Sequence, residues 1–194
     1  MKSEIVNTFD KSVKPYLRKI QKEYIKILCK YQPIHASKVM YKKFFKKKLN
    51  LKSPKEFNEK LMWLKINKYT NNDLVTKCAD KYLVRDYVIE CGLGFLLNDL
   101  IDVFDSADSI NWNELPNKFV LKCNHGAGYN IICSDKSKLN IDETVQLLEK
   151  YMNENYAQKF AETQYKNIVR KIVCEKYLDP KEGEESIADF KLHC

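Results

Sequence analysis

Helical spacing of apolar residues dominates the first part of the chain. Over residues 11–30 the apolar side chains fall on one stripe and lysines occupy the rest of the surface, which predicts an amphipathic helix. The stripe consists of Val13, Leu17, Ile20, Tyr24, Ile27 and Leu28. We expect the helix to end at Pro33, because proline cannot continue a helical hydrogen-bond ladder.

Two more helices are predicted before the first glycine. Ser53 suits an N-cap, Pro54 suits the first turn and Glu56 completes a capping box, so a helix is expected to begin there. Residues 73–90 form a further run with apolar residues near one face. The glycines of the Cys91–Gly94 step are expected to end that helix.

The periodicity changes in the second half of the chain. Apolar runs of strand length occur at residues 96–104, 118–124, 130–134, 171–178 and 188–194, and a helix is predicted over residues 140–158. We expect the run at 96–104 to be a buried strand. The turn HGAGY joins the runs at 118–124 and 130–134, which predicts a β-hairpin. Helices followed by strands and one long helix indicate an α+β fold.

Positive charge is concentrated at one end of the chain. Residues 1–55 hold 16 Lys and Arg residues against three acids, a balance of +13, whereas the whole chain carries +8. Such an end indicates an anionic partner: membrane phospholipid, an acidic glycan or nucleic acid. The segment KVMYKKFFKKKLNLK could lie on a membrane surface or form a solvated helix docked on the protein. The lack of a known nucleic-acid motif argues against nucleic acid.

Compartment and metal chemistry are constrained by what the sequence lacks. No run approaches the ~18 apolar residues of a membrane span, and the first residues do not read as a secretory signal. We therefore expect a cytoplasmic protein, with peripheral contact at the inner face of the membrane as an option. The seven cysteines form no C-x-x-C pair and are interpreted as mostly buried, reduced thiols. The three histidines lack ligand-spaced partners, which argues against a zinc site.

Candidate chemistry centres on the run KFVLKCNHGAGYNI. A strand delivers Lys122, and a turn with Gly126 and Gly128 follows at once. Glycines let backbone N–H groups approach phosphate oxygens, and lysine supplies the matching charge. Neither a Walker loop nor a Rossmann fingerprint is present, so phosphate binding and an ordinary hairpin turn both remain open. His125, within the turn, could contact substrate or phosphate.

Two other segments add candidates. Lys81 and Arg85 are expected one turn apart on a helix, where both could face one anion or form part of a solvated face. The run IVCEKYL, residues 172–178, could offer backbone groups and apolar side chains to adenine, although many buried strands end in the same way.

The order of several motifs resembles one family. PKEFNEKLMWLK, ADKYLVRDYV, LPNKFVLKCNHGAGYNII, IVCEKYL and ADFKLHC occur in the order found in the TupA-like, or teichuronopeptide-biosynthesis, branch of the ATP-grasp superfamily. Its members are often labelled polysaccharide-biosynthesis proteins or glycosyltransferases. The resemblance runs from about residue 52 to residue 194 and implies a partial ATP-grasp fold. The expected organisation is a basic amphipathic helical segment (1–50), a helical region before the ATP-grasp part (51–115), a nucleotide-binding subdomain (116–178) and the start of a second subdomain (179–194).

The resemblance also implies roles for individual residues. Lys81 resembles the first ATP-grasp lysine and Lys122 the second, both of which contact nucleotide phosphates. The loop that closes over the β- and γ-phosphates is expected at Gly126, Ala127 and Gly128. The adenine hinge is expected at Glu175, Lys176, Tyr177 and Leu178, with the backbone of Glu175 and Leu178 pairing with the base.

The implied activity is ATP-dependent ligation on a polysaccharide or peptide-modified glycan precursor, in which a carboxylate is phosphorylated and then attacked by a nucleophile. Magnesium is expected on the phosphates, with its ligands beyond residue 194, so no metal ligand is assigned. We accordingly expect the 194-residue chain to be inactive as a monomer. Glycosyl transfer is the alternative activity, although no D-x-D motif occurs. A non-catalytic anion-binding module is the third hypothesis.

Overall fold

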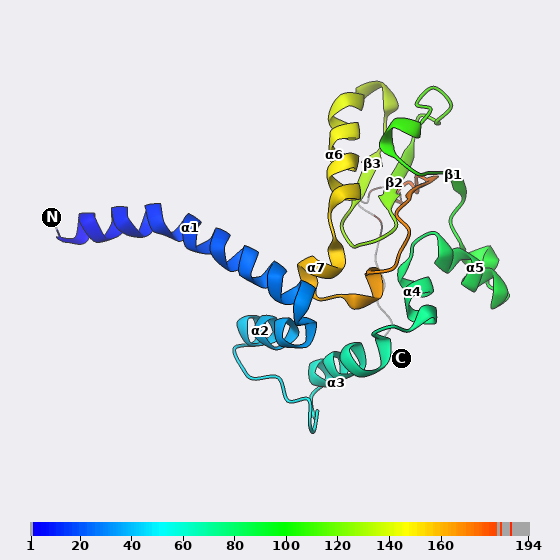
Figure 1. The fold of residues 1–194 in the computed structure, drawn as a ribbon. Helices are drawn as coiled ribbons and strands as arrows, with labels where there is room; N and C mark the ends of the chain where they lie inside the picture. Colours follow the sequence, from blue (N-terminus) through cyan, green and yellow to red (C-terminus); the bar gives the residue numbers. More distant parts are fainter. Residues whose placement is uncertain (1, 182, 184–186, 188–194) are drawn as a thin grey trace. The chain divides into compact units, whose positions relative to one another are not determined.

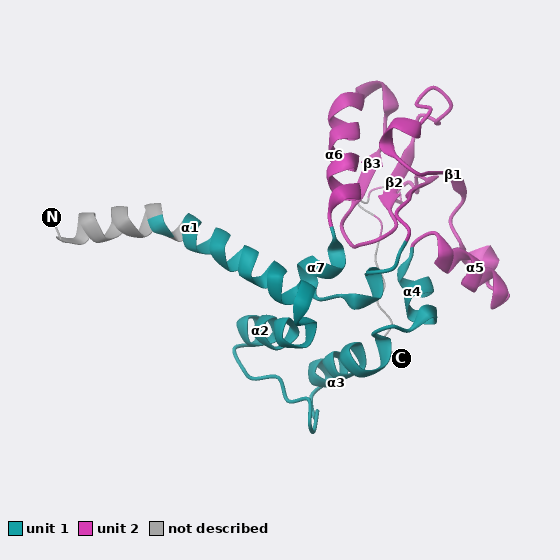
Figure 2. Ribbon diagram, viewed as in Figure 1, with its two compact units in different colours: residues 1–80, 155–168 teal, residues 81–154, 169–194 magenta. Residues whose placement is uncertain are grey.

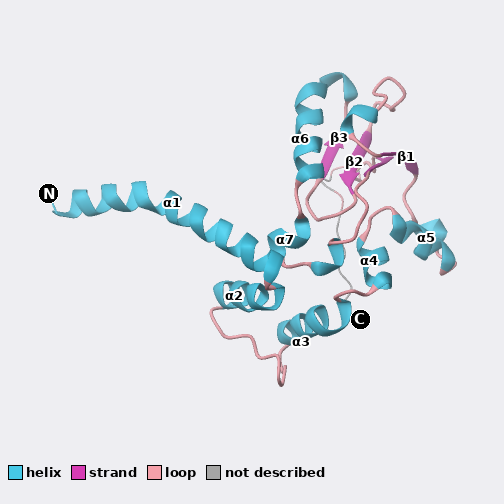
Figure 3. Ribbon diagram, in the orientation of Figure 1, coloured by secondary structure: helices cyan, strands magenta, loops and turns pink. Residues whose placement is uncertain are grey.

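The structure, a computed structural model, describes residues 2–181 together with 183 and 187 (Figure 1). The chain divides into two compact units (Figure 2). Unit 1 comprises Met1–Asp80 and Asn155–Ile168, and unit 2 comprises Lys81–Glu154 and Val169–Cys194. Helices and an antiparallel four-stranded sheet occur among the described residues, which confirms the α+β class (Figure 3).

Unit 1 is helical. Its helices are α1 (Lys2–Tyr31), α2 (Pro33–Phe45), α3 (Phe57–Leu64), α4 (Asp73–Ala79) and α7 (Tyr156–Phe160), and a π-helical turn, Lys65–Tyr69, extends α3. The long α1 packs against both α2 and α7. Leu28 and Cys29 of α1 meet Ala36 and Ala161 in a small buried core. The C-terminal part of α1 is therefore the part that packs into the core of unit 1.

Of the predicted helix boundaries in unit 1, one is confirmed and one is wrong. The first helix, α1, ends at Tyr31, just before Pro33 as expected, and Pro33 then begins α2, because a proline at the first helical position needs no N–H partner. The next helix begins after Glu56, which forms a capping box with Glu59. Ser53 is not the cap, because its N–H donates to the side chain of Asn50 (3.1 Å) in a preceding turn.

The helix predicted over residues 73–90 is two helices. α4 ends at Ala79, and α5 (Leu83–Glu90) begins in unit 2 after a break. Within unit 2 the backbone N–H of Lys81 donates to the carbonyl of Asn124 (3.3 Å), so it is not part of a helical ladder. Lys81 and Arg85 therefore do not share one helical face, and the prediction that they do is wrong.

Unit 2 contains the sheet. Its strands are β1 (Leu100–Phe104), β2 (Phe119–Cys123), β3 (Asn130–Cys133) and β4 (Ile172–Lys176), in the order β1-β4-β2-β3 with every pair antiparallel. The predicted hairpin is confirmed as β2 and β3. The helix α6 (Ile141–Asn153) packs against β2. The helix predicted over 140–158 ends at Asn153, and a new cap at Asn155 starts α7.

The first and last predicted strands have different outcomes. The run at 96–104 forms a strand only from Leu100, and of that strand only Phe104 is buried, because β1 is an edge strand. The prediction of a buried strand there is wrong. The strand predicted at 188–194 lies outside the described residues.

The pleat of the sheet separates a core face from a polar face. Phe119, Leu121 and Cys123 of β2 alternate with half-buried Val120 and Lys122. Across the ladder Leu121 pairs with buried Cys174, and Val120 pairs with Glu175. Lys122 and Glu175 therefore lie on the same face, opposite the core.

The cysteines separate by burial. Cys29, Cys123, Cys133 and Cys174 are buried, whereas Cys78 and Cys91 are exposed, and all six are free thiols. Burial raises the pKa of the Cys123 thiol to about 11 and that of Cys174 to about 12. The buried thiols are therefore protonated at neutral pH, as expected for cysteines that pack as small apolar side chains.

Candidate nucleotide-binding site

The turn between β2 and β3 is fixed at its first residue. The buried side chain of Asn124 accepts from the backbone N–H of Lys171 (2.8 Å) and donates to the carbonyl of Val169 (2.9 Å). Its own N–H donates to the carbonyl of Lys171 (3.0 Å). Asparagine can both donate and accept, so one residue ties the turn to the segment that leads into β4.

His125 anchors the middle of the same turn. The ring is 3% exposed, its Nε2 lies 3.1 Å from the carbonyl oxygen of Tyr151 in α6, and it packs near Tyr129. Burial, with a smaller effect of the positive charge of Arg170, lowers the pKa of His125. The structure thus places His125 against α6 and not at a surface where substrate would reach it.

The exposed part of the turn is the glycine segment. Ala127 and Gly128 are exposed, whereas Gly126 is buried. Gly128 has φ of +78°, in the left-handed region that favours glycine. The turn therefore presents backbone to solvent at the point where the sequence predicts phosphate contacts.

Lys81 lies at the base of this turn. Its amine donates to the carbonyl of Cys123 (3.0 Å) and to the carbonyl of Gly126, and its backbone N–H donates to Asn124. The structure therefore brings Lys81 together with the glycine turn, across more than forty residues of sequence.

A second cationic group lies on the polar face of the sheet. The amine of Lys122 donates to Oε2 of Glu175 (2.5 Å), and Arg85 of α5 approaches Oε1 of the same carboxylate at 3.5 Å. Arg85 also donates to the carbonyl of Asn98 (2.7 Å). The Glu175 and Arg85 side chains are 10% and 14% exposed, and Lys122 is 29% exposed. One largely buried carboxylate thus orients two cations, and this cluster carries a net charge of one positive unit.

The run expected to form the adenine hinge straddles the end of β4. Glu175 and Lys176 belong to the strand. The backbone N–H of Lys176 donates to the carbonyl of Asp99 (3.0 Å), and its carbonyl accepts from the side chain of Asn98 (2.8 Å). Tyr177 and Leu178 follow the strand, and Leu178 is 49% exposed. Tyr177 and Leu178 are therefore the members of this run that leave the sheet.

Sequence reasoning did not assign Asn124 or the carboxylate of Glu175 as organising residues. The signal for Asn124 was its place at the end of a strand, directly before a glycine turn, where asparagine commonly satisfies backbone groups. The contact between Glu175 and Arg85 carries no local signal, because the two residues are ninety positions apart.

The chemistry of the described residues in this region can be compared with two kinds of ligand, phosphates and metal ions. Lys81, Lys122 and the exposed glycine turn suit an anionic ligand, since ammonium groups and backbone N–H groups are donors. Among residues 2–181, 183 and 187, no group of three or more His, Cys, Asp or Glu side chains could hold a metal ion. The carboxylate of Glu175 is engaged by two cations, Lys122 and Arg85.

Comparison of the sequence with models of known protein families identifies a matching family. The family model described as TupA-like ATPgrasp matches residues 59–194, well over half of the chain. No curated protein and no solved structure matched. The α+β architecture is consistent with part of an ATP-grasp fold, and such proteins generally bind ATP and magnesium and act as ligases. The chain belongs to the TupA-like ATP-grasp family.

Proposed function

We propose that unit 2 binds the phosphates of ATP at the glycine turn and Lys122. The observation that supports this is the grouping of Lys81 with Gly126 at the base of an exposed turn, beside a strand whose Lys122 is oriented by Glu175. An ammonium group has three donors, so Lys122 can contact a phosphate oxygen while it keeps its bond to Glu175. Arg85 holds the second oxygen of that carboxylate, which fixes the direction of the pair.

The remaining assignments extend this proposal. Lys81, whose amine bonds to the carbonyl of Gly126, neutralises phosphate charge at the turn, and the backbone N–H groups of Gly126, Ala127 and Gly128 donate to phosphate oxygens. Tyr177 and Leu178, which leave the sheet, together with Glu175 and Lys176, contact adenine.

The reaction we propose is ATP-dependent ligation in the assembly of a capsular or cell-surface polysaccharide. ATP supplies the phosphoryl group that activates a carboxylate, and a nucleophile on a glycan or peptide-modified glycan precursor then attacks. The residues described here bind and orient phosphates by charge and hydrogen bonding, which is the part of the reaction that their chemistry supports.

Calorimetric titration of ATP into the chain, with magnesium present, tests the binding proposal. Lys122→Ala should weaken binding by about 1–3 kcal/mol, the scale of a lost charge-assisted hydrogen bond. Lys138→Ala is the matched control, because Lys138 lies in the same unit, but its side chain is 84% exposed and its amine pairs with Asp135 (3.4 Å). Equal ATP affinity in wild type and Lys122→Ala would remove Lys122 from the site. Inorganic triphosphate that binds as tightly as ATP would favour the anion-binding alternative.

We also propose that unit 1 makes peripheral contact with an anionic membrane. Five apolar or aromatic side chains at helical spacing on α1 are each at least half exposed: Leu17, Ile20, Tyr24, Ile27 and Tyr31. Lysines flank them, as in helices that lie in a membrane interface. No helix among the described residues is long and apolar enough to cross a bilayer.

Sedimentation with phosphatidylglycerol vesicles tests the membrane proposal. Binding should fall steeply with salt and should be lost when Leu17, Ile20 and Tyr24 are changed to serine. Vesicle binding that survives these changes would show that the stripe has no role, and α1 would then be a solvated helix.

A further inference from the structure

Unit 1 contains a cavity of about 390 Å³ bounded by α2, the end of α3 and α7. It is lined by Ser37, Met40, Tyr41, Phe44, Phe45, Met62, Lys65, Tyr156, Phe160 and Glu162. The five lining residues from α2 are spaced as one face of a helix, so one face of α2 forms a wall of the cavity. Aromatic and methionine side chains dominate, and methionine adapts to flexible apolar ligands.

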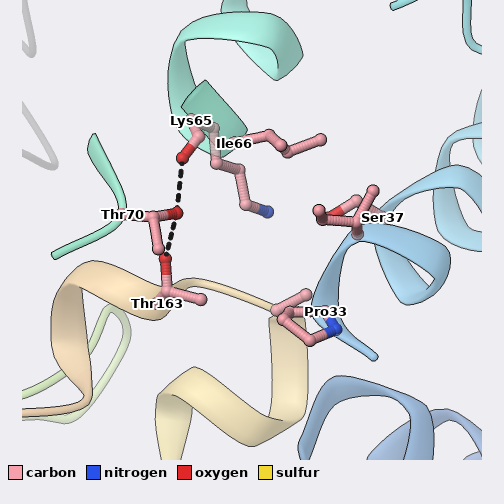
Figure 4. Close-up of a pocket in the computed structure, with 8 residues that line it drawn as sticks. Pro33, Ser37, Lys65, Ile66, Thr70 and Thr163 are labelled. Atoms are coloured by element: carbon pink, nitrogen blue, oxygen red, sulfur yellow. Dashed lines mark hydrogen bonds between the residues drawn. The ribbon is translucent and has the colours of Figure 1, made fainter. Parts of the chain in front are cut away.

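The polar groups of the cavity are mostly satisfied by one another. The amine of Lys65, whose side chain is 11% exposed, pairs with Glu162 (3.1 Å) and donates to the carbonyl of Phe160 (3.3 Å). Lys65 and Ser37 also line an adjoining cavity of about 110 Å³, and Figure 4 shows the amine of Lys65 extending toward Ser37 within it. Because Lys65 and Glu162 bond to each other, they leave few hydrogen-bonding groups to recognise a highly polar ligand.

Tyr41 differs from the other lining residues. It is 3% exposed, yet its hydroxyl has no hydrogen-bond partner among the described residues. Buried hydroxyls are nearly always hydrogen-bonded, because leaving one unpaired costs free energy. A ligand with an oxygen acceptor where its apolar chain joins a polar headgroup would satisfy this hydroxyl.

The outer surface of α2 is cationic. Lys38, Lys42 and Lys43 are exposed, and α2 contains no acidic residue. Phe44 of the same helix lines the cavity and is 81% exposed, so it presents an apolar side chain to solvent at the edge of the cavity. An apolar cavity beside a row of lysines is complementary to an amphiphile with an anionic head.

We propose that this cavity binds the hydrocarbon chain of an anionic membrane lipid, with an ester carbonyl accepting from Tyr41 and the lysines of α2 contacting the headgroup. The proposal deepens the membrane contact of unit 1 and rests on it. It differs from simple adsorption, because a single lipid would occupy a defined site bounded by α2, the end of α3 and α7. Lipid binding would then hold the enzyme where a membrane-linked substrate is available.

The test uses the full chain and lysophosphatidylglycerol, an anionic lipid with one chain, below its micelle concentration. Tryptophan fluorescence or calorimetry should show saturable binding, and glycerol phosphate, which has the head but no chain, should not compete. Met62→Trp fills the cavity and should weaken binding at least tenfold. Met152→Trp, at a half-buried methionine of α6 in unit 2, is the matched control and should bind as wild type.

Charge is tested separately. Lys42→Glu with Lys43→Glu should remove the preference for lysophosphatidylglycerol over lysophosphatidylcholine, whereas Lys138→Glu with Lys150→Glu, an equal charge change in unit 2, should not. If wild type and Met62→Trp bind the lysolipid equally, the cavity is not the site and the proposal falls. If vesicles bind but the lysolipid does not, the lipid site is refuted while the membrane contact stands. If neither binds, both are refuted.

Discussion

Glu175→Gln tests the view that one carboxylate orients two cations, Lys122 and Arg85, in the proposed nucleotide site. The substitution keeps the shape of the side chain but removes the charge between Lys122 and Arg85, which then face each other across a neutral amide. Removing one partner of a fully buried ion pair costs about 3–5 kcal/mol. We expect about 2–3 kcal/mol here, since Lys122 retains 29% of its side-chain exposure and water can still screen it.

Urea denaturation of the full chain, followed by circular dichroism, measures this loss. With a slope of about 1–3 kcal/mol per molar urea, the midpoint for unit 2 should fall by roughly 1–2 M. Asp179→Asn provides the contrast, because it removes an exposed pair with Lys118 and should cost less than about 1 kcal/mol. Adding Lys122→Met to Glu175→Gln should recover part of the loss, because the two cations no longer repel. A Glu175→Gln midpoint equal to that of wild type would refute the reasoning.

Three further outcomes follow from the structure. Burial lowers the pKa of His125, so as the pH falls the unfolded chain binds a proton at a higher pH than the folded chain does. The free energy of unfolding should therefore decrease below about pH 6.5. Thermal melts of His125→Gln should depend less on pH in that range. Gly128→Ala should destabilise unit 2 by about 1–2 kcal/mol in urea denaturation, the cost of a left-handed conformation with a side chain, and an unchanged midpoint would contradict the assigned turn. Iodoacetamide followed by mass spectrometry should modify exposed Cys91 well before Cys174, whose thiol has a pKa of about 12, and equal rates would show that β4 is open.

Local patterns were sufficient for the parts of the fold that depend on neighbours in sequence. The β2–β3 hairpin was predicted because two apolar strands flank a turn that contains Gly126 and Gly128. The amphipathic helix was predicted because the stripe from Leu17 to Ile27 repeats with helical period. Both signals lie within about twenty residues.

The errors arose where distant residues decide the local structure. The helix over residues 73–90 is interrupted because the N–H of Lys81 bonds to Asn124, more than forty positions away. The expected strand at 96–104 is short and exposed because it pairs on one side only, with β4. Neither the edge position of a strand nor the partner of Lys81 leaves a periodic signal in the sequence.

The candidate site divides in the same way. Lys122 and the glycine turn could be identified from spacing, and the family resemblance added Lys81 and the run 175–178. The bond between Lys122 and Glu175 and the anchoring of His125 on α6 depend on packing, so they became visible only in three dimensions.

The most direct test of the central claim is a nuclear magnetic resonance titration of the labelled chain with ATP and magnesium. The account predicts that the amide signals of Gly126, Ala127 and Gly128 shift together on addition of ATP and that Lys122→Ala reduces the shift at each ATP concentration. Saturating ATP that leaves these three amides unmoved, or that moves only residues of unit 1, would contradict it.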